Sequence, residues 1–150
     1  MQSGQICMST ERIVVQRSIA DAFRQKLAET AEKLFGKEAP ALVLVNSAAV
    51  AKNKKLVGDA VARGANVLFG DVNANESINT GMRPMIVDGV TKEMDMYATE
   101  SFGPTVSLFT VDTEDEAIAL ANDTEYGLTA SVFTNNLFRG LRVARQIDSG

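Results

Sequence analysis

Short β-branched runs alternate with amphipathic stretches along the whole 150-residue chain. Residues 11–16 and 105–111 have the composition of strands, and residues 67–69 and 85–87 are short apolar runs typical of buried strands. Residues 18–35 carry apolar side chains at i+3 and i+4 spacing, which predicts an amphipathic helix. Strands that alternate with helices predict an α/β fold: an open twisted sheet with helices packed on it.

Side chains that can cap a helix N-terminus occur at several places between the apolar runs. Each such side chain accepts a hydrogen bond from a backbone N–H that the first helical turn leaves without a partner. The expected caps are Ser18, Asn46, Thr113 with Glu116 three residues on, and Asn136. Between the last two helices we expect a further strand over residues 128–134.

Length and charge exclude several classes of protein. A chain of this size, without repeats or linkers, is expected to form one domain. Fifteen basic against nineteen acidic residues give a net charge of −4, which argues against a general nucleic-acid binder. No apolar run approaches the roughly 18 residues of a membrane span. One cysteine forms no internal disulfide, so a reducing cytoplasm is the expected location.

Cys7 is the only cysteine, and the chain contains no histidine. Metal clusters and histidine-dependent triads therefore cannot be built from these residues alone, and a thiolate is the leading candidate nucleophile. The alternative is a small buried hydrophobic residue, which is the usual state of a free cysteine. Gly4 would allow close backbone approach to a ligand. A turn starting at Ser9 would aim amides at the sulfur, favouring the thiolate and an oxyanion.

Residues 100–104, Glu-Ser-Phe-Gly-Pro, form a second candidate motif. The simple interpretation is a turn before a strand, with Glu100 solvated and Phe102 in the core. The functional interpretation is a rigidly held carboxylate that accepts two hydrogen bonds from a ribose diol. Residues 71–79 imitate a calcium loop, but Glu76 replaces the required glycine and Met82 the bidentate glutamate. We therefore expect a polar surface loop there and no metal site.

Taken in order, these motifs resemble the NAD(P)-dependent aldehyde dehydrogenases. Residues 4–7, Gly-Gln-Ile-Cys, are similar to that family's active-site segment, and residues 100–104 to its Glu-x-Phe-Gly-Pro motif. Residues 81–84 resemble the glycine-to-proline stretch before that motif. Residues 122–134 resemble its Asn-x-x-x-Tyr-Gly-Leu-x-Ala-x-Val-Phe-Thr run. The residues around Cys7 look most like the branch that acts on aromatic aldehydes, such as salicylaldehyde and vanillin dehydrogenases.

The resemblance implies a role for particular residues. Cys7 would be the nucleophile that attacks the aldehyde carbon, and its backbone amide would supply part of the oxyanion hole. Glu100 would bind the nicotinamide ribose of NAD or NADP, and Phe102 would lie near the nicotinamide ring. Further matches concern the adenine-side ribose and the aldehyde channel. These are Lys55 for the ribose, and Ile6 and Met8 for the channel.

The resemblance also implies parts that these 150 residues do not contain. The family's nucleotide-binding domain, its general-base glutamate and the asparagine of its oxyanion hole match no segment here. We therefore expect residues 1–150 to be a partial, thiol-bearing catalytic domain, truncated at both ends and inactive alone. The full enzyme would be a homo-oligomer with an aldehyde substrate. Alternatives are a non-catalytic truncated product that only folds and associates, or a stand-alone thiol-dependent hydrolase or redox protein.

Overall fold

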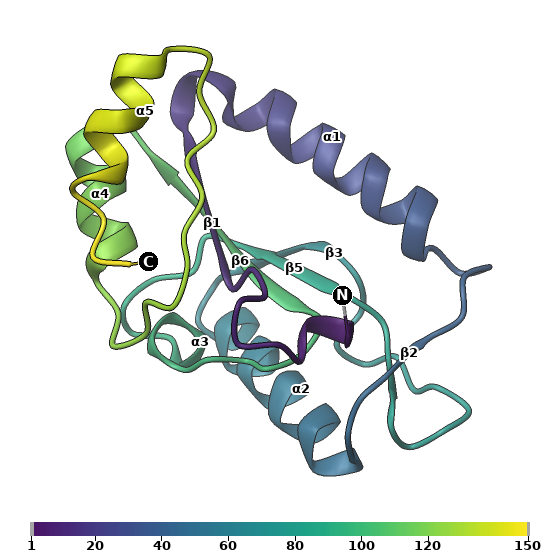
Figure 1. Ribbon diagram of the computed structural model, residues 1–150. Helices are drawn as coiled ribbons and strands as arrows, with labels where there is room; N and C mark the ends of the chain where they lie inside the picture. The colour runs from purple at the N-terminus through teal and green to yellow at the C-terminus, as the bar shows by residue number, and fades with distance from the viewer. Residues whose placement is uncertain (1, 150) are drawn as a thin grey trace.

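The computed structural model describes residues 2–149 as a four-stranded sheet with helices on both faces (Figure 1). A separate two-stranded sheet lies beside the loop that precedes the second long helix. The helices are the 3₁₀-helix η1 (Gln2–Gly4), α1 (Arg17–Phe35), α2 (Ser47–Ala62), α3 (Asp95–Ala98), α4 (Glu114–Asn122) and α5 (Leu137–Ala144). The strands are β1 (Arg12–Gln16), β2 (Leu42–Val43), β3 (Asn66–Phe69), β4 (Gly81–Met82), β5 (Met85–Asp88) and β6 (Thr105–Val111).

The main sheet has the strand order β1-β6-β5-β3. β1, β6 and β5 run parallel, and β3 is antiparallel to β5. Arg12 at the start of β1 lies opposite Ser107 of β6, and Met85 of β5 lies opposite Thr105. The segments that lead into β1 and β6 therefore lie side by side at the amino ends of these two neighbouring parallel strands.

The two faces of the sheet carry separate apolar clusters. Leu108 of β6 is fully buried with Val15 and Ala20, which is the side covered by α1. Its neighbour Phe109 points to the opposite face and packs in the larger cluster with Val57 of α2. Successive residues of a strand point to opposite faces, so β6 is buried on both sides and serves as the centre of the fold.

Local capping chemistry explains where three of the helices begin. Asn46 accepts from the amide of Ala49 at 2.9 Å, and Asn136 accepts from that of Arg139 at 2.9 Å. Thr113 and Glu116 form a reciprocal capping box. These three predicted starts are confirmed.

The predicted cap at Ser18 is wrong. β1 passes directly into α1, which begins at Arg17, so Ser18 already lies inside the first turn. The preceding residue, Gln16, makes no side-chain cap. Continuous backbone from strand to helix leaves no room for a separate capping residue at position 18.

The predicted strand over residues 128–134 is also wrong. This segment is coil between α4 and α5 (Figure 1), and its side chains are exposed, with Phe133 at 95%. Both edges of β6 are occupied by β1 and β5, so a further strand would need another edge. An isolated extended segment without a ladder is not a stable strand in water. The strands predicted over 11–16, 67–69, 85–87 and 105–111 are found.

Candidate functional site

The cysteine segment and the Glu-Ser-Phe-Gly-Pro segment meet because of the strand order. Cys7 lies just before β1, and Glu100 lies just before β6, which is the neighbour of β1 in the sheet. Open α/β sheets usually bind ligands at the carboxyl ends of their strands. Here the two candidate segments lie at the amino ends instead.

Gly4 lies directly against Gly103. Gly4 has φ +76°, and a Cβ at this position would fall 2.0 Å from the Gly103 carbonyl oxygen. Only glycine allows the two backbones to come this close. The close approach that the sequence suggested for a ligand is therefore made to the neighbouring backbone.

Cys7 lies at the tip of a tight turn and is exposed. The Ile6 carbonyl oxygen accepts from the Ser9 amide at 2.8 Å, and the Ser9 hydroxyl accepts from the Ile6 amide at 3.3 Å. This turn presents the thiol to solvent, so the buried-hydrophobe interpretation is wrong. The turn ends at Ser9, whereas the sequence predicted a turn that starts there and aims its amides at the sulfur, and the Ser9 amide donates to Ile6.

Gln5 ties the cysteine segment to strand β2 and to the residues just after it. Its side-chain amide donates to the Val43 carbonyl at 3.2 Å, and its Oε1 accepts from the Val45 amide at 2.7 Å. One side chain thus bonds the backbone in the way that a neighbouring strand would. Sequence reasoning assigned no role to this glutamine, since its partners lie about 40 residues away in the chain.

Glu11 is a half-buried carboxylate between the two segments, and sequence reasoning missed it. Both of its oxygens lie 3.1 Å from the Ser101 amide, and Oε1 also accepts from the Ser101 hydroxyl at 3.0 Å and the Phe102 amide at 3.1 Å. Burial raises the pKa of Glu11, the Ser101 and Phe102 donors oppose this rise, and the charge of Glu100 adds to it. No local pattern marks this residue, because its partners are 90 positions away.

Asn53 of α2 approaches the same loop from the other side. Its side chain is fully buried and donates to the carbonyls of Ala49 at 3.0 Å and Ser101 at 3.2 Å. A Cβ on Gly103 would fall 2.4 Å from the Asn53 amide nitrogen. The glycine at 103 is thus required by close packing on this buried amide.

The predicted site residues fall into two groups. Cys7, Ile6 and Met8 share one turn, and of the three Ile6 is half-buried while Met8 is 58% exposed. Glu100 is half-buried, and Phe102 is 39% exposed with a left-handed φ of 50°. The turn and the loop of Glu100 are held together by the contacts described above.

Lys55 lies apart from these groups, exposed on α2. It follows Asn53 by two positions, so its side chain leaves the helix about 200° around the axis from that of Asn53. The helix therefore directs Asn53 at the loop and Lys55 elsewhere. A role for Lys55 in cofactor binding stays a prediction.

A second polar cluster holds the end of α4 against β1. Arg12 donates to the carbonyls of Leu120 and Asp123, each at 3.0 Å, and to that of Tyr97. Its guanidinium lies 4.7 Å from the centre of the Tyr97 ring. The Tyr97 hydroxyl donates to Asp123 at 2.5 Å, and Lys92 pairs with the same carboxylate. Burial raises the pKa of Tyr97, and the Lys92 and Tyr97 hydrogen bonds lower that of Asp123.

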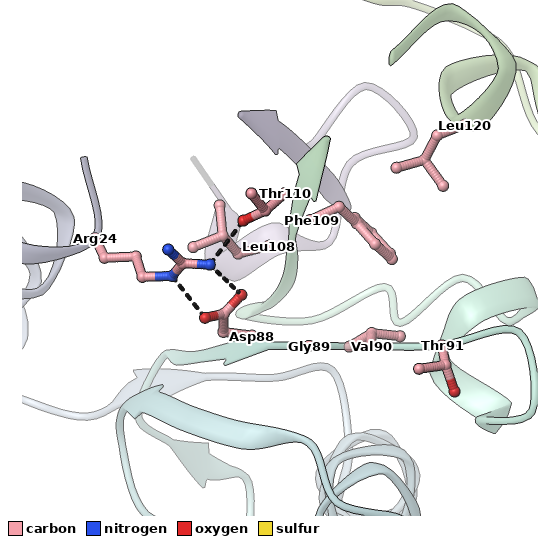
Figure 2. A pocket seen from close by; sticks show the side chains of 9 residues that line it. All are labelled: Arg24, Asp88, Gly89, Val90, Thr91, Leu108, Phe109, Thr110 and Leu120. Atoms are coloured by element: carbon pink, nitrogen blue, oxygen red, sulfur yellow. Dashed lines mark hydrogen bonds and ion pairs between the residues drawn. The ribbon is translucent and has the colours of Figure 1, made fainter. Parts of the chain in front are cut away.

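A hollow of about 280 Å³ lies at the opposite end of the parallel strands, by the carboxyl ends of β5 and β6 (Figure 2). There Arg24 of α1 pairs with Asp88 at 2.7 Å and donates to the Thr110 hydroxyl at 2.6 Å. Because these polar groups already bond one another, the hollow offers little unpaired charge. Its position separates it from the turn that carries Cys7.

Within residues 2–149, no group of three or more cysteine, aspartate and glutamate side chains is arranged to hold a metal ion. None of the helices in the range is long and apolar enough to cross a bilayer.

The fold and the site define an α/β sheet that presents an exposed thiol at the amino edge of its parallel strands. The family model described as "Aldehyde dehydrogenase family" matches residues 1–150. The chain belongs to this family.

Individual relatives agree with this assignment. A vanillin dehydrogenase of Pseudomonas sp. strain HR199 is 41% identical over 152 residues, which span 98% of this chain and 31% of that protein. The crystal structure of a salicylaldehyde dehydrogenase from Pseudomonas putida G7, complexed with salicylaldehyde, superposes with a TM-score of 0.87. It is 35% identical, over 99% of this chain and 31% of that one. The crystal structure of a succinic semialdehyde dehydrogenase from Streptococcus pyogenes in complex with NADP+ superposes with a TM-score of 0.88. It is 29% identical, over 99% of this chain and 33% of that one. The chain thus spans about a third of the length of these relatives.

Proposed function

We propose that residues 1–150 are the thiol-bearing part of the catalytic domain of a longer aldehyde dehydrogenase, which oxidises an aromatic aldehyde to its carboxylic acid. The observation that carries this proposal is the joining of two turns at one edge of the sheet. The turn of Cys7 and the loop of Glu100 are tied by the contact of Gly4 with Gly103 and by the hydrogen bonds of Glu11.

Cys7 would carry the covalent chemistry. Its thiolate attacks the carbonyl carbon of the aldehyde, and the carbonyl oxygen becomes the oxyanion of a thiohemiacetal. The backbone amide of Cys7 donates to that oxyanion. Loss of hydride from the carbon leaves a thioester on Cys7. Water then hydrolyses the thioester, which releases the acid and restores the thiol.

The loop of Glu100 suits a nicotinamide cofactor, NAD or NADP. Glu100 is a half-buried carboxylate whose two oxygens can accept from a ribose diol, and the Phe102 ring is partly exposed beside it. The bound nicotinamide would supply the acceptor for the hydride. Relatives in complex with NADP+ support the assignment to this class of cofactor.

Ile6 and Met8 flank the thiol and would line the aldehyde channel. Their apolar side chains suit an aromatic ring, and relatives named for vanillin and salicylaldehyde support this class of substrate. Other relatives are named for succinate semialdehyde, which makes a short carboxylated aldehyde the substrate to compare.

Further parts of the longer polypeptide would complete the site. We propose that they supply the nucleotide-binding domain, the general base and the second oxyanion donor, and that the whole enzyme is a homo-oligomer. Loss of one oxyanion donor costs about 10²–10³ in kcat, and loss of a general base a further 10²–10⁴. The 150-residue chain alone is therefore expected to show no useful turnover.

Steady-state formation of NADH or NADPH tests the proposal. The full-length polypeptide is assayed with vanillin, salicylaldehyde and succinate semialdehyde, beside its Cys7→Ser variant and the 150-residue chain. The proposal expects turnover of the aromatic aldehydes in the full-length wild type only. Turnover that survives Cys7→Ser, or an ordinary enzymatic rate from the 150 residues, would contradict it.

A further inference from the structure

We propose that Glu11 is a positioning residue, whose carboxylate fixes the loop of Glu100 and Phe102 relative to Cys7 and thereby sets cofactor affinity. This inference rests on the proposed function of Cys7 and Glu100. It concerns a residue to which the family resemblance assigns no role.

The carboxylate is held by donors only. The Ser101 amide, the Ser101 hydroxyl and the Phe102 amide all lie 3.0–3.1 Å from its oxygens. A carboxylate without its proton is an acceptor alone, so it matches this set of donors. An uncharged amide in its place would turn an NH₂ group toward some of them.

These hydrogen bonds act on particular peptide groups. The Ser101 amide belongs to the peptide that joins Glu100 to Ser101. The Phe102 amide belongs to the next peptide, whose carbonyl oxygen on Ser101 accepts from Asn53 at 3.2 Å. Glu11 and Asn53 thus hold that peptide at its two polar ends. Its orientation is fixed from both sides.

Phe102 shows why such a hold is needed. Its φ of 50° is left-handed, a region that residues with a Cβ seldom adopt. Strained backbone of this kind persists where the surroundings over-determine it. The peptide held by Glu11 and Asn53 immediately precedes the strained Cα, and so it helps to fix the φ of Phe102 and the point from which its side chain leaves the backbone.

Glu11 is also rigid with respect to the thiol. Its carbonyl oxygen accepts from the Ser107 amide of β6 at 2.9 Å, which ties the residue to the sheet immediately before β1 begins. It follows Cys7 by four positions, just beyond the turn closed by Ile6 and Ser9. A single short segment therefore carries both the nucleophile and the group that orients the cofactor loop.

The test compares Glu11→Gln, Glu11→Asp and Ser101→Ala with the wild type in the full-length polypeptide. Calorimetry gives the Kd for NAD+ and NADP+, and kinetics give the two KM values and kcat. For Glu11→Gln we expect the cofactor Kd and KM to rise about tenfold, the aldehyde KM to stay within about twofold, and the Tm to stay near that of the wild type. Glu11→Asp keeps the charge, so its cofactor Kd and KM should lie between those of the wild type and of Glu11→Gln. Ser101→Ala loses one donor and should show the smallest rise.

Glu38→Gln, at an exposed glutamate in the turn after α1, is the matched control and should equal the wild type. An unchanged cofactor Kd in Glu11→Gln overturns the inference. A fall in Tm accompanied by similar rises in the cofactor KM and the aldehyde KM also overturns it, because that pattern marks a purely structural residue. A wild type that binds neither cofactor overturns the proposed function, and the inference with it.

Discussion

The backbone of Gly4 lies so close to Gly103 that a Cβ on Gly4 would fall 2.0 Å from the Gly103 carbonyl oxygen. Ninety-nine positions separate the two glycines in the sequence. Their contact joins the turn that carries the thiol to the loop that carries Glu100. The site therefore depends on the absence of a side chain at position 4.

Gly4→Ala should destabilise the chain and separate the two loops. The new methyl group meets backbone atoms, and the left-handed φ of +76° adds roughly 1–2 kcal/mol for a residue with a Cβ. We expect a loss of at least about 2 kcal/mol in the free energy of unfolding, measured in urea. Gly58→Ala is the control. Nothing lies within 4 Å of its Cβ position inside α2, so it should add about 0.5–1 kcal/mol of stability. Equal effects of the two substitutions would contradict the packing argument.

Arg12→Lys should weaken the attachment of α4 to β1. Nη1 of the guanidinium donates to the carbonyls of Leu120 and Asp123 while Nη2 donates to that of Tyr97, and the single nitrogen of a lysine ammonium cannot occupy both positions. We expect a loss of about 1.5–3 kcal/mol in unfolding free energy, the range for hydrogen bonds to charged groups. Arg145→Lys, at an exposed arginine after α5, should stay within about 0.5 kcal/mol. A loss at Arg12 no larger than that at Arg145 would show that the cluster contributes little.

The stability difference between the wild type and Glu11→Gln should change with pH in one direction. Because burial raises the pKa of Glu11 above its unfolded value, the folded state binds more protons than the unfolded state in the window between the two values. The wild type should therefore lose stability relative to Glu11→Gln as pH rises through this window, which begins near the ordinary glutamate pKa of 4.5. Urea unfolding at a series of pH values measures this change. A wild type that instead gains stability relative to Glu11→Gln as pH rises would mean that the hydrogen bonds of Ser101 and Phe102 outweigh burial.

The 150-residue chain should self-associate in solution. Phe133 is 95% exposed, Phe138 82% and Leu137 71%, so residues 128–141 present apolar area that a soluble monomer rarely leaves open. Light scattering should report a mass above 16.1 kDa that rises with concentration. Changing both phenylalanines to aspartate should restore the monomer, whereas Leu34→Asp, at an exposed leucine of α1, should not. A clean monomer for the wild type would contradict the expectation.

Local chemistry made some elements of this fold predictable. The caps at Asn46, Thr113 and Asn136 need only the side chain and the amide three positions ahead, so the sequence contains the whole interaction. The strand over 128–134 has the right residues, but a strand also needs an edge to pair with. Nothing in its own composition tells whether that edge is available.

The residues of the candidate site likewise differ in whether their partners are near or distant in the sequence. Cys7 and Glu100 could be proposed as site residues from the sequence because each stands within a short recognisable motif. Glu11, Asn53 and Gln5 were missed because their partners lie 90, 48 and about 40 positions away. Their role depends on the pairing of β1 with β6 and on the packing of α2, which only the folded chain reveals.

The most direct test of the account is mass spectrometry of the full-length polypeptide, quenched with acid during turnover of vanillin with NAD+ or NADP+. The account predicts an adduct on the peptide that contains Cys7, with the mass of the aldehyde less two hydrogens, as a thioester requires. It also predicts that Cys7→Ser abolishes both the adduct and the reduced cofactor. Reduced cofactor formed at the wild-type rate by Cys7→Ser, with the aldehyde oxidised and no adduct at position 7, would contradict it.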